Sequence, residues 1–222
     1  MIPVKLRSER CKYKNIREFA NTTLINIAID KALKCFDRKD IYINSRDNYM
    51  KLIAKRNNIR FHRRSAWEST EIETNDDFLY DFMKRVDCEY VMQINTTSPF
   101  TTWQNVYNMK LLMTWYEYDA IFSVYEIKNH CMFRDNITLN YHRCGKMKQT
   151  QDIEPMMVFT NGIMGWKKET AMKNMKKHGA CVYGCWSNIR YYKIEGLATI
   201  DIDTEEEFKI AEMLYKNKEL LK

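Results

Sequence analysis

Two aspartates near the carboxyl end of the chain, Asp201 and Asp203, have the spacing of a shared metal site. The surrounding run 196–208 reads as a short strand that leads into a helix. Side chains of a strand alternate between its faces, so both carboxylates point the same way, with Cα atoms roughly 6.5–7 Å apart. Such a pair can share one Mg²⁺ ion with a phosphate-bearing substrate. Taken alone, the short pattern is more typical of solvated acids that precede a helix cap.

A second chemical group is a stretch rich in Lys and Arg that runs from Arg7 to Arg17. It follows a short apolar start, which reads as the first strand of an α/β sheet. Loops at the carboxyl edge of such sheets bind ligands. Cations there could clamp a triphosphate and offset the charge on a leaving pyrophosphate. A solvated basic loop or a nucleic-acid patch is the alternative interpretation.

The elements that must position these groups alternate along the chain. Strand-like runs lie at 40–44, 90–94, 120–125 and 163–166, and helical patterns lie at 24–35, 49–57, 76–86, 103–115 and 167–177. A last helix is expected over 205–221, with Thr204 as its N-cap and Glu207 completing a capping box. The alternation predicts an α/β fold: a mostly parallel, Rossmann-like sheet flanked by helices.

Composition and length favour one domain over residues 1–222. Hydrophobic residues make up 45% of the chain, which is ample for a core, and no linker or repeat divides it. The net charge of +7 suits an anionic ligand. No nucleic-acid-binding signature accompanies that charge, so we expect no nucleic-acid partner.

Location and metal content are predicted from the same composition. We find no signal peptide and no apolar run approaching a membrane span, so no membrane partner is expected. The seven scattered cysteines read as reduced thiols of a cytoplasmic protein. A zinc site at His178, Cys181 and Cys185 is a weaker alternative, because fourth-ligand candidates lie far away in sequence.

The motifs of the whole chain, taken in order, resemble one family. Residues 2–17 resemble the I-P-A-R-x-G-S-K-R-x-P-x-K-N-I signature of the acylneuraminate cytidylyltransferases, or CMP-sialic acid synthetases. Later segments resemble the family's motifs at 36–47 (F-D-x-I-x-V-S-T-D-S), 97–100 (T-S-P-[LF]), 151–155 (R-Q-D-L-x-P) and 200–204 (I-D-I-D-T). The resemblance implies a fold of the nucleotide-diphospho-sugar transferase type.

The resemblance also implies a reaction and its residues. A sialic-acid-like (nonulosonic) sugar acid would be activated with CTP to a CMP-sugar, releasing pyrophosphate, with Mg²⁺ held by Asp201 and Asp203. Lys5, Arg10 and Lys14 would act with the two aspartates in catalysis. The expected nucleotide-binding set is Lys5, Ser8, Arg10, Lys14, Asn15, Arg63, Asn75, Asn95 and Ser98. A homodimer is implied, with a dimerisation and sugar-binding arm around 126–160.

Several departures from the family pattern fall at functional positions. Arg7 stands where the family has Gly, and Glu9 where it usually has Lys. Gln151 occupies a position that is often Arg and would help to hold the carboxylate of the sugar acid. We therefore expect Arg134 to supply that cation, with Gln151 and Asn161 completing the sugar-binding set.

Two further functions stay open at this stage. One is a related nucleotide-sugar enzyme, such as a Kdo-type cytidylyltransferase or a glycosyltransferase. A glycosyltransferase typically carries its Asp-x-Asp motif in mid-chain, whereas here the motif lies near the end. The other is a catalytically inactive nucleotide-binding homologue, which the residues at positions 7, 9 and 151 keep in consideration.

Overall fold

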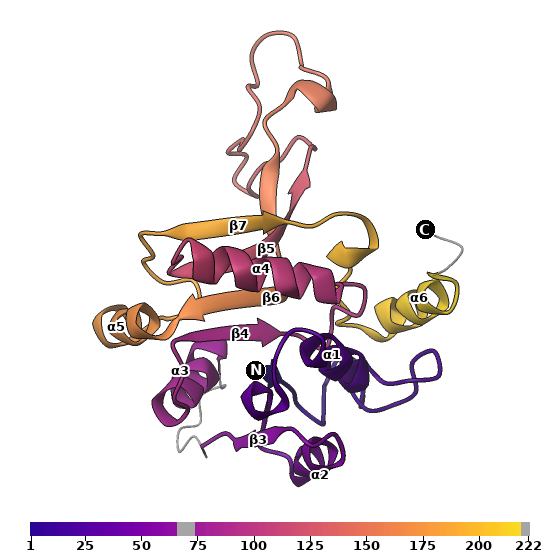
Figure 1. The fold of residues 1–222 in the computed structure, drawn as a ribbon. Coiled ribbons are helices and arrows are strands. Elements are labelled where there is room, and N and C mark those ends of the chain that lie inside the picture. The colour runs from indigo at the N-terminus through magenta and orange to yellow at the C-terminus, as the bar shows by residue number, and fades with distance from the viewer. Residues whose placement is uncertain (66–73, 219–222) are drawn as a thin grey trace.

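The computed structural model describes residues 1–65 and 74–218, and its strands form two sheets that meet at the first residue (Figure 1). The three-stranded sheet is parallel, in the order β1 (Ile2–Pro3), β2 (Tyr42–Ser45) and β3 (Arg60–Arg63). The four-stranded sheet has the order β4 (Tyr90–Ile94), β6 (Met156–Lys167), β5 (Ala120–Ile127) and β7 (Ile189–Lys193). Met1 joins them, because its amino group donates to Met92 O at 2.7 Å and its carbonyl accepts from Ile94 N at 3.0 Å.

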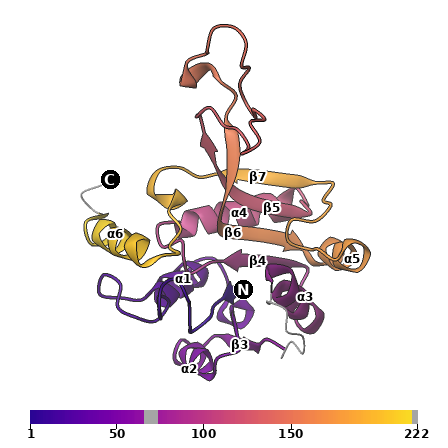
Figure 2. The ribbon, with the colours of Figure 1, turned by 180° about the vertical axis from the view of Figure 1, so that it is seen from behind.

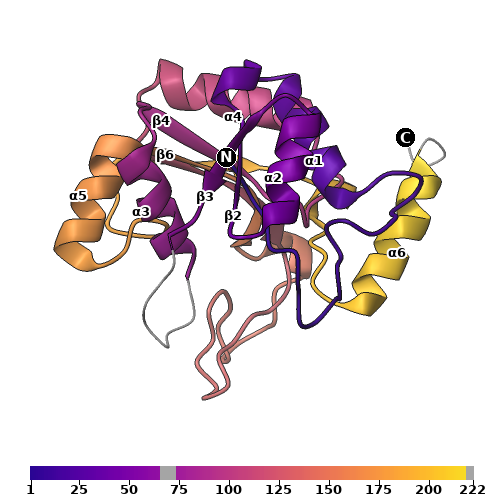
Figure 3. The same cartoon turned by 90° about the horizontal axis from the view of Figure 1, so that it is seen from below.

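Helices cover both faces of these sheets. α1 (Leu24–Leu33) packs against α4 (Trp103–Trp115) on one face, and α3 (Asn75–Arg85) packs against α5 (Lys168–His178) on the other (Figure 3). α2 (Asn48–Arg56) packs on β2 and β3. α6 (Glu205–Lys216) lies beside the amino-terminal loop. Three short 3₁₀ turns complete the elements: η1 (Arg38–Asp40), η2 (Thr150–Asp152) and η3 (Gly196–Thr199).

The strands alternate their side chains between two cores, as period 2 requires. Ile121 of β5 packs in the core under α1 and α4, whereas its neighbours Ala120 and Phe122 pack in the core under α3 and α5. A third, smaller core joins α6 to the amino-terminal loop through Phe19, Ile202 and other buried side chains. This third core matters for the site, because it holds the segment between Asp201 and Asp203 against the start of the chain.

Several predicted elements are confirmed within a residue or two. β4 and α4 have the predicted bounds, and α6 begins at Glu205 with Thr204 as N-cap and Glu207 in a capping box. The predicted end of that helix, at 221, is not reached: α6 ends at Lys216, and residues 219–222 lie outside the described ranges. The α/β class is correct.

The predicted sheet direction is only partly correct. β6 runs antiparallel to both β4 and β5, so the sheets are partly mixed. The predicted strand at 163–166 is only the end of this 12-residue element, which returns directly from β5 through the arm. β6 pairs antiparallel because the arm brings the chain back beside the end of β5, where Ile127 pairs with Met156, instead of crossing to its beginning. The strand predicted through 200–203 was also wrong: the 3₁₀ turn η3 leads into an extended segment outside the sheets.

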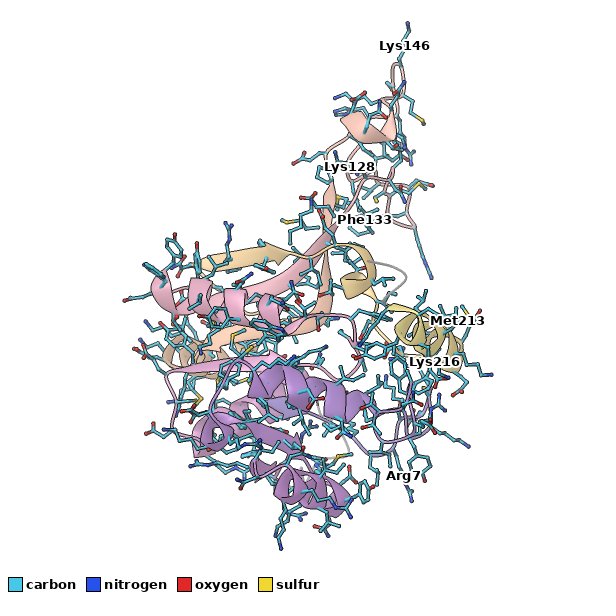
Figure 4. The ribbon with its side chains drawn as sticks, turned by 45° about the vertical axis from the view of Figure 1, so that its right-hand side comes forward. Arg7, Lys128, Phe133, Lys146, Met213 and Lys216 are labelled. Atoms are coloured by element: carbon cyan, nitrogen blue, oxygen red, sulfur yellow. The ribbon has the colours of Figure 1, made fainter. Side chains whose placement is uncertain are left out.

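The segment between β5 and β6 forms an arm that projects from the sheets (Figures 1 and 2). Lys146 lies at its outer end and Lys128 nearer its base (Figure 4). Large apolar side chains are exposed along the arm: Met132, Phe133, Ile137, Leu139 and Met147. All seven cysteines are free thiols. Within the described ranges, no helix is both long enough and apolar enough to cross a bilayer.

Candidate active site

A pocket of about 580 Å³ opens where β1, β3 and β4 end and where the Lys- and Arg-rich stretch 7–17, called the basic loop below, begins. Carboxyl ends of parallel strands are the usual ligand-binding edge of an α/β sheet. The pocket, called the basic pocket below, is lined by 16 residues: Pro3, Val4, Lys5, Arg7, Ser8, Glu9, Arg10, Lys14, Asn15, Arg64, Asn75, Phe78, Gln93, Asn95, Thr96 and Thr97. Seven of the nine residues expected to bind nucleotide are in this set.

Asn15 fastens the basic loop to the sheet. Its side-chain amide donates to Lys5 O at 2.8 Å, and its side-chain oxygen accepts from the Thr96 hydroxyl at 2.7 Å. Asn15 is buried, so these bonds fix the loop between β1 and α1 against the end of β4. Its side chain therefore shapes the pocket wall, while the neighbouring side chains of Lys5, Arg7 and Arg10 are exposed and available to a ligand.

Arg63, which was expected at the nucleotide, lies outside the basic pocket, whereas its neighbour Arg64 lines it. Arg63 is exposed and donates to Arg46 O at 3.1 Å and to the Asn48 side chain, outside the basic pocket. Arg64 is buried, donates to the side chain and carbonyl of Asn44, and stacks over Phe78 at 4.1 Å. Arg64 lines the pocket because residues one apart at a strand end face opposite sides.

The two aspartates lie directly behind the basic loop. Between them, Ile202 is buried, and its N–H donates to Thr97 O at 2.9 Å. Asp203 accepts from Arg10 at 2.8 Å and from Lys14 at 3.1 Å, and Lys14 also donates to Ile202 O at 2.5 Å. Both ends of the chain thus meet in one charged cluster beside the pocket.

Asp201 has different surroundings from Asp203. Its carboxylate accepts from the Ser98 hydroxyl at 3.5 Å, and Ser98 itself is buried behind the pocket wall. Burial raises the pKa of Asp201, and the neighbouring Asp203 charge raises it further, while hydrogen bonds from Thr97 and Ser98 oppose the rise. A partly desolvated carboxylate beside a second one is stabilised when a cation is shared between them.

Asp201 and Asp203 suit a hard divalent cation that keeps some of its coordination positions for water or substrate. Two aspartates two residues apart supply oxygen ligands, and water or phosphate oxygens would complete the shell, as Mg²⁺ prefers. Within residues 1–65 and 74–218, no three His, Cys, Asp or Glu side chains are grouped to enclose a metal. The Cys181 side chain of the weaker zinc alternative is buried beside Asp76, while Cys185 is exposed.

The residues expected to bind the sugar are divided between two places. The carbonyl of Asn161 accepts from the pocket residue Asn95 at 2.6 Å, and its side chain accepts from the Tyr183 hydroxyl at 2.5 Å. Arg134 and Gln151 lie in the arm and are not among the residues that line the basic pocket of the same chain. Figure 4 shows Arg7 on the body of the molecule, well apart from Lys146 on the arm.

Sequence reasoning missed some pocket residues. Gln93 and Phe78 line the pocket but were not expected there. Gln93 and Asn95 alternate at the end of β4, so two polar side chains on one face of an otherwise apolar strand could have indicated the site. Ser98 was expected at the nucleotide, yet its hydroxyl is directed to Asp201.

Comparisons with known proteins identify the family of the chain. The family model for cytidylyltransferases matches residues 1–220. The chain therefore belongs to the cytidylyltransferase family, as the motifs predicted. N-acylneuraminate cytidylyltransferases of Streptococcus agalactiae serotypes III and V are 23% and 22% identical to it over 219 residues. The match covers 94% of this chain and 51% of each relative, so the chain spans about half the length of these relatives.

Solved structures match the fold over nearly the whole chain. The structure of CMP:2-keto-3-deoxy-manno-octonic acid synthetase complexed with CTP is 12% identical, with a TM-score of 0.70, covering 98% of this chain and 97% of that one. The 4-diphosphocytidyl-2C-methyl-D-erythritol synthase of Anaerococcus prevotii is 14% identical, with a TM-score of 0.66, covering 97% and 96%. At these identities the likeness establishes the fold alone.

Proposed function

We propose that this chain transfers a cytidylyl group from CTP to a nonulosonic, 2-keto sugar acid. The observation that carries the proposal is the cluster of Arg10, Lys14 and Asp203, because it joins the basic loop that lines the pocket to the carboxylate pair beside it. In the reaction, a hydroxyl of the sugar acid attacks the α-phosphorus of CTP and loses its proton. The bond from that phosphorus to the bridging oxygen breaks, and pyrophosphate leaves.

The exposed cations of the loop are suited to the triphosphate. Lys5, Arg7 and Arg10 are exposed beside the pocket, and in the absence of a ligand Arg10 rests on Asp203. A bound triphosphate would compete with Asp203 for Arg10 and for Lys14, which both line the pocket. Arg7 supplies charge at the position where the family uses the bare backbone of Gly. Positioning and charge neutralisation of this kind account for most catalysis of phosphoryl-type transfers.

Asp201 and Asp203 would hold a divalent cation, Mg²⁺ being the expected one. That ion would supply further neutralisation of the phosphate charge. Asp201 offers a carboxylate oxygen held by Ser98, and Asp203 offers one that Arg10 would vacate on turning toward the phosphates. Metal binding and nucleotide binding should therefore favour one another.

The sugar side of the reaction includes the arm. Since Arg134 and Gln151 do not line the pocket of their own chain, we propose a homodimer in which the exposed apolar residues of the arm are covered by a second copy. Arg134 would then contact the carboxylate of the acceptor. The acceptor of the structural match, 2-keto-3-deoxy-manno-octonic acid, makes a Kdo-type sugar acid the second candidate substrate.

Thermal denaturation with nucleotides tests the proposal. CTP should raise the melting temperature by mass action, more than ATP or GTP at equal concentration. Lys14→Ala should remove most of that rise. Lys12→Ala is the matched control, because Lys12 is an exposed cation of the same loop that does not line the pocket, and it should respond as the unaltered chain does. An equal rise with all nucleotides would contradict the proposal.

The acceptor assignment has its own test. Arg134→Ala should raise the KM for the sugar acid or lower kcat/KM while leaving the CTP response unchanged. Loss of one charged partner of this kind typically costs about 1.5–3 kcal/mol. Lys146→Ala, at the outer end of the arm, is the control of equal charge. Turnover of a sugar 1-phosphate without turnover of any 2-keto acid would contradict the assignment.

A further inference from the structure

Lys31 is a buried cation of α1 that the proposed reaction does not use. Its amino group donates to Ser98 O at 2.7 Å and to the Thr101 hydroxyl at 2.9 Å. It forms no ion pair with any described residue, so no carboxylate offsets its charge. Burial lowers the pKa of Lys31 to about 7. Burying a lysine without an acidic partner is costly, and such an arrangement is uncommon in a purely structural role.

The segment that Lys31 holds, residues 96–101, contacts both halves of the candidate active site. At one end the Thr96 hydroxyl donates to Asn15, which fastens the basic loop. In the middle, Thr97 O accepts from Ile202 N. Beside it, the Ser98 hydroxyl donates to Asp201 at 3.5 Å. Small shifts of this segment would therefore change the distance between the carboxylate pair and the basic loop.

We propose that Lys31 is a positioning residue that sets Asp201 for metal binding by fixing Ser98 from beneath. Its bond to the Ser98 carbonyl fixes the backbone from which the Ser98 hydroxyl reaches Asp201. This inference rests on the proposed function, since it assumes that Asp201 is a metal ligand. Lys31 itself touches neither carboxylate.

A purely structural role for Lys31 predicts a different outcome. If the lysine only held the fold together, Lys31→Met would lower the stability of the protein. Replacing a buried charge with an apolar side chain of similar length is often neutral or stabilising. The carbonyl of Ser98 would also keep a donor in that variant, because the Thr101 hydroxyl donates to it at 2.9 Å. Positioning therefore predicts weaker metal binding in a protein that melts no earlier.

The test measures binding of Mn²⁺, a paramagnetic substitute for Mg²⁺, by the loss of the free-ion EPR signal when protein is added without nucleotide, because CTP itself binds Mn²⁺. We expect Lys31→Met to weaken Mn²⁺ binding by about 10-fold, the lower end of the effect of residues that support metal ligands. Lys31→Gln keeps a hydrogen-bond donor and should restore most of the affinity. Lys34→Met, at the exposed C-cap of the same helix, should bind as the unaltered chain does.

A double variant tests whether Lys31 acts on Asp201 through Ser98. In a Ser98→Ala background, Lys31→Met should have little further effect on Mn²⁺ affinity, since both changes release the same carboxylate. Should Lys31→Met fail to fold, Thr101→Val removes the other partner of the amino group, and Lys31→Gln serves for the comparison. Full Mn²⁺ affinity in a folded Lys31→Met protein, or an equal loss in Lys34→Met, would overturn the inference.

The unaltered chain and an Asp201→Asn variant separate this inference from the proposed function. If the two bind Mn²⁺ equally, the metal site itself is wrong, and the role of Lys31 is overturned with it. If Asp201→Asn loses binding while Lys31→Met retains it, only the role of Lys31 is overturned.

Discussion

The ammonium of Lys14 lies 3.1 Å from the carboxylate of Asp203, although the two residues are 189 positions apart. Lys14 is buried, and the same ammonium also binds Ile202 O, so the pair is held rigidly on one side. Through this contact the basic loop that follows β1 and the acidic segment that precedes α6 form one site. The proposed chemistry depends on that meeting of the two ends of the chain.

Asp203→Asn should abolish most turnover while preserving the fold. We expect pyrophosphate formation to fall by about 100-fold or more, the loss typical when a group that stabilises reacting charge is removed. The free energy of unfolding should change by less than about 2 kcal/mol, because Lys14 keeps Ile202 O as an acceptor. Glu205→Gln, two residues on, makes the same chemical change in the partner of Arg17 and should keep activity. Near-normal turnover by Asp203→Asn at saturating Mg²⁺ would refute the metal assignment.

The two neighbouring arginines after β3 should differ in their effect on CTP. Arg63→Ala should leave CTP affinity unchanged, because its side chain binds Arg46 and Asn48 outside the pocket. Arg64→Lys should weaken CTP binding, since lysine loses the planar fork with which Arg64 spans Asn44 and stacks on Phe78. Isothermal titration with CTP measures both variants, and the reverse result would restore the original assignment of Arg63.

Gly162→Ala should impair the site through Ser98. A Cβ at this position would lie 2.9 Å from Ser98 Oγ and 3.1 Å from Thr101 Cγ2, so the segment that supports Asp201 must shift. Overpacking typically costs about 1–3 kcal/mol. Gly165→Ala in the same strand meets Met113 Sδ at 2.7 Å, away from Ser98, and serves as the control. At a temperature where both variants are folded, only Gly162→Ala should need more Mg²⁺ for activity; equal Mg²⁺ requirements would count against the role of Ser98.

Some elements of the fold could be predicted from the sequence, and others could not. The bounds of β4, α4 and the start of α6 follow from local pattern and capping chemistry, which a sequence displays directly. The direction of β6 does not, because it depends on how the chain returns from the arm. The polar strands β3 and β7 lack apolar alternation and were not predicted.

The candidate site was predicted best where residues of like charge lie close together in the sequence. The basic loop and the aspartate pair were identified by charge and spacing, and the structure brings them together. Which of Arg63 and Arg64 faces the pocket depends on how side chains alternate at the end of β3. An error of one residue in the position of the strand reverses the answer. The importance of Lys31 depends on burial against the segment 96–101, and a lone lysine in a helix gives no sign of that.

Acid should destabilise the protein through His62. Burial and the nearby charge of Arg85 lower the pKa of His62 to about 4, and its Nε2 has no partner among the described residues. Between about pH 6.5 and pH 4 the unfolded chain therefore binds a proton that the folded chain does not. The free energy of unfolding should fall by about 3 kcal/mol across that window as the pH is lowered.

Urea denaturation at a series of pH values checks this expectation. His62→Asn removes the titrating group, so the loss of stability between pH 6.5 and 4 should become smaller. His178→Gln replaces an exposed histidine and should leave the loss unchanged. A pH dependence that is the same in His62→Asn and the unaltered chain would contradict the buried, neutral state of His62.

The most direct test of the central claim is pyrophosphate release, measured with each of the four nucleoside triphosphates and a panel of nonulosonic and Kdo-type sugar acids. The account predicts release that requires CTP, a 2-keto sugar acid and a divalent cation together, and that is lost in Asp203→Asn. Release that shows no preference for CTP, or none with any 2-keto acid despite CTP binding, would contradict it.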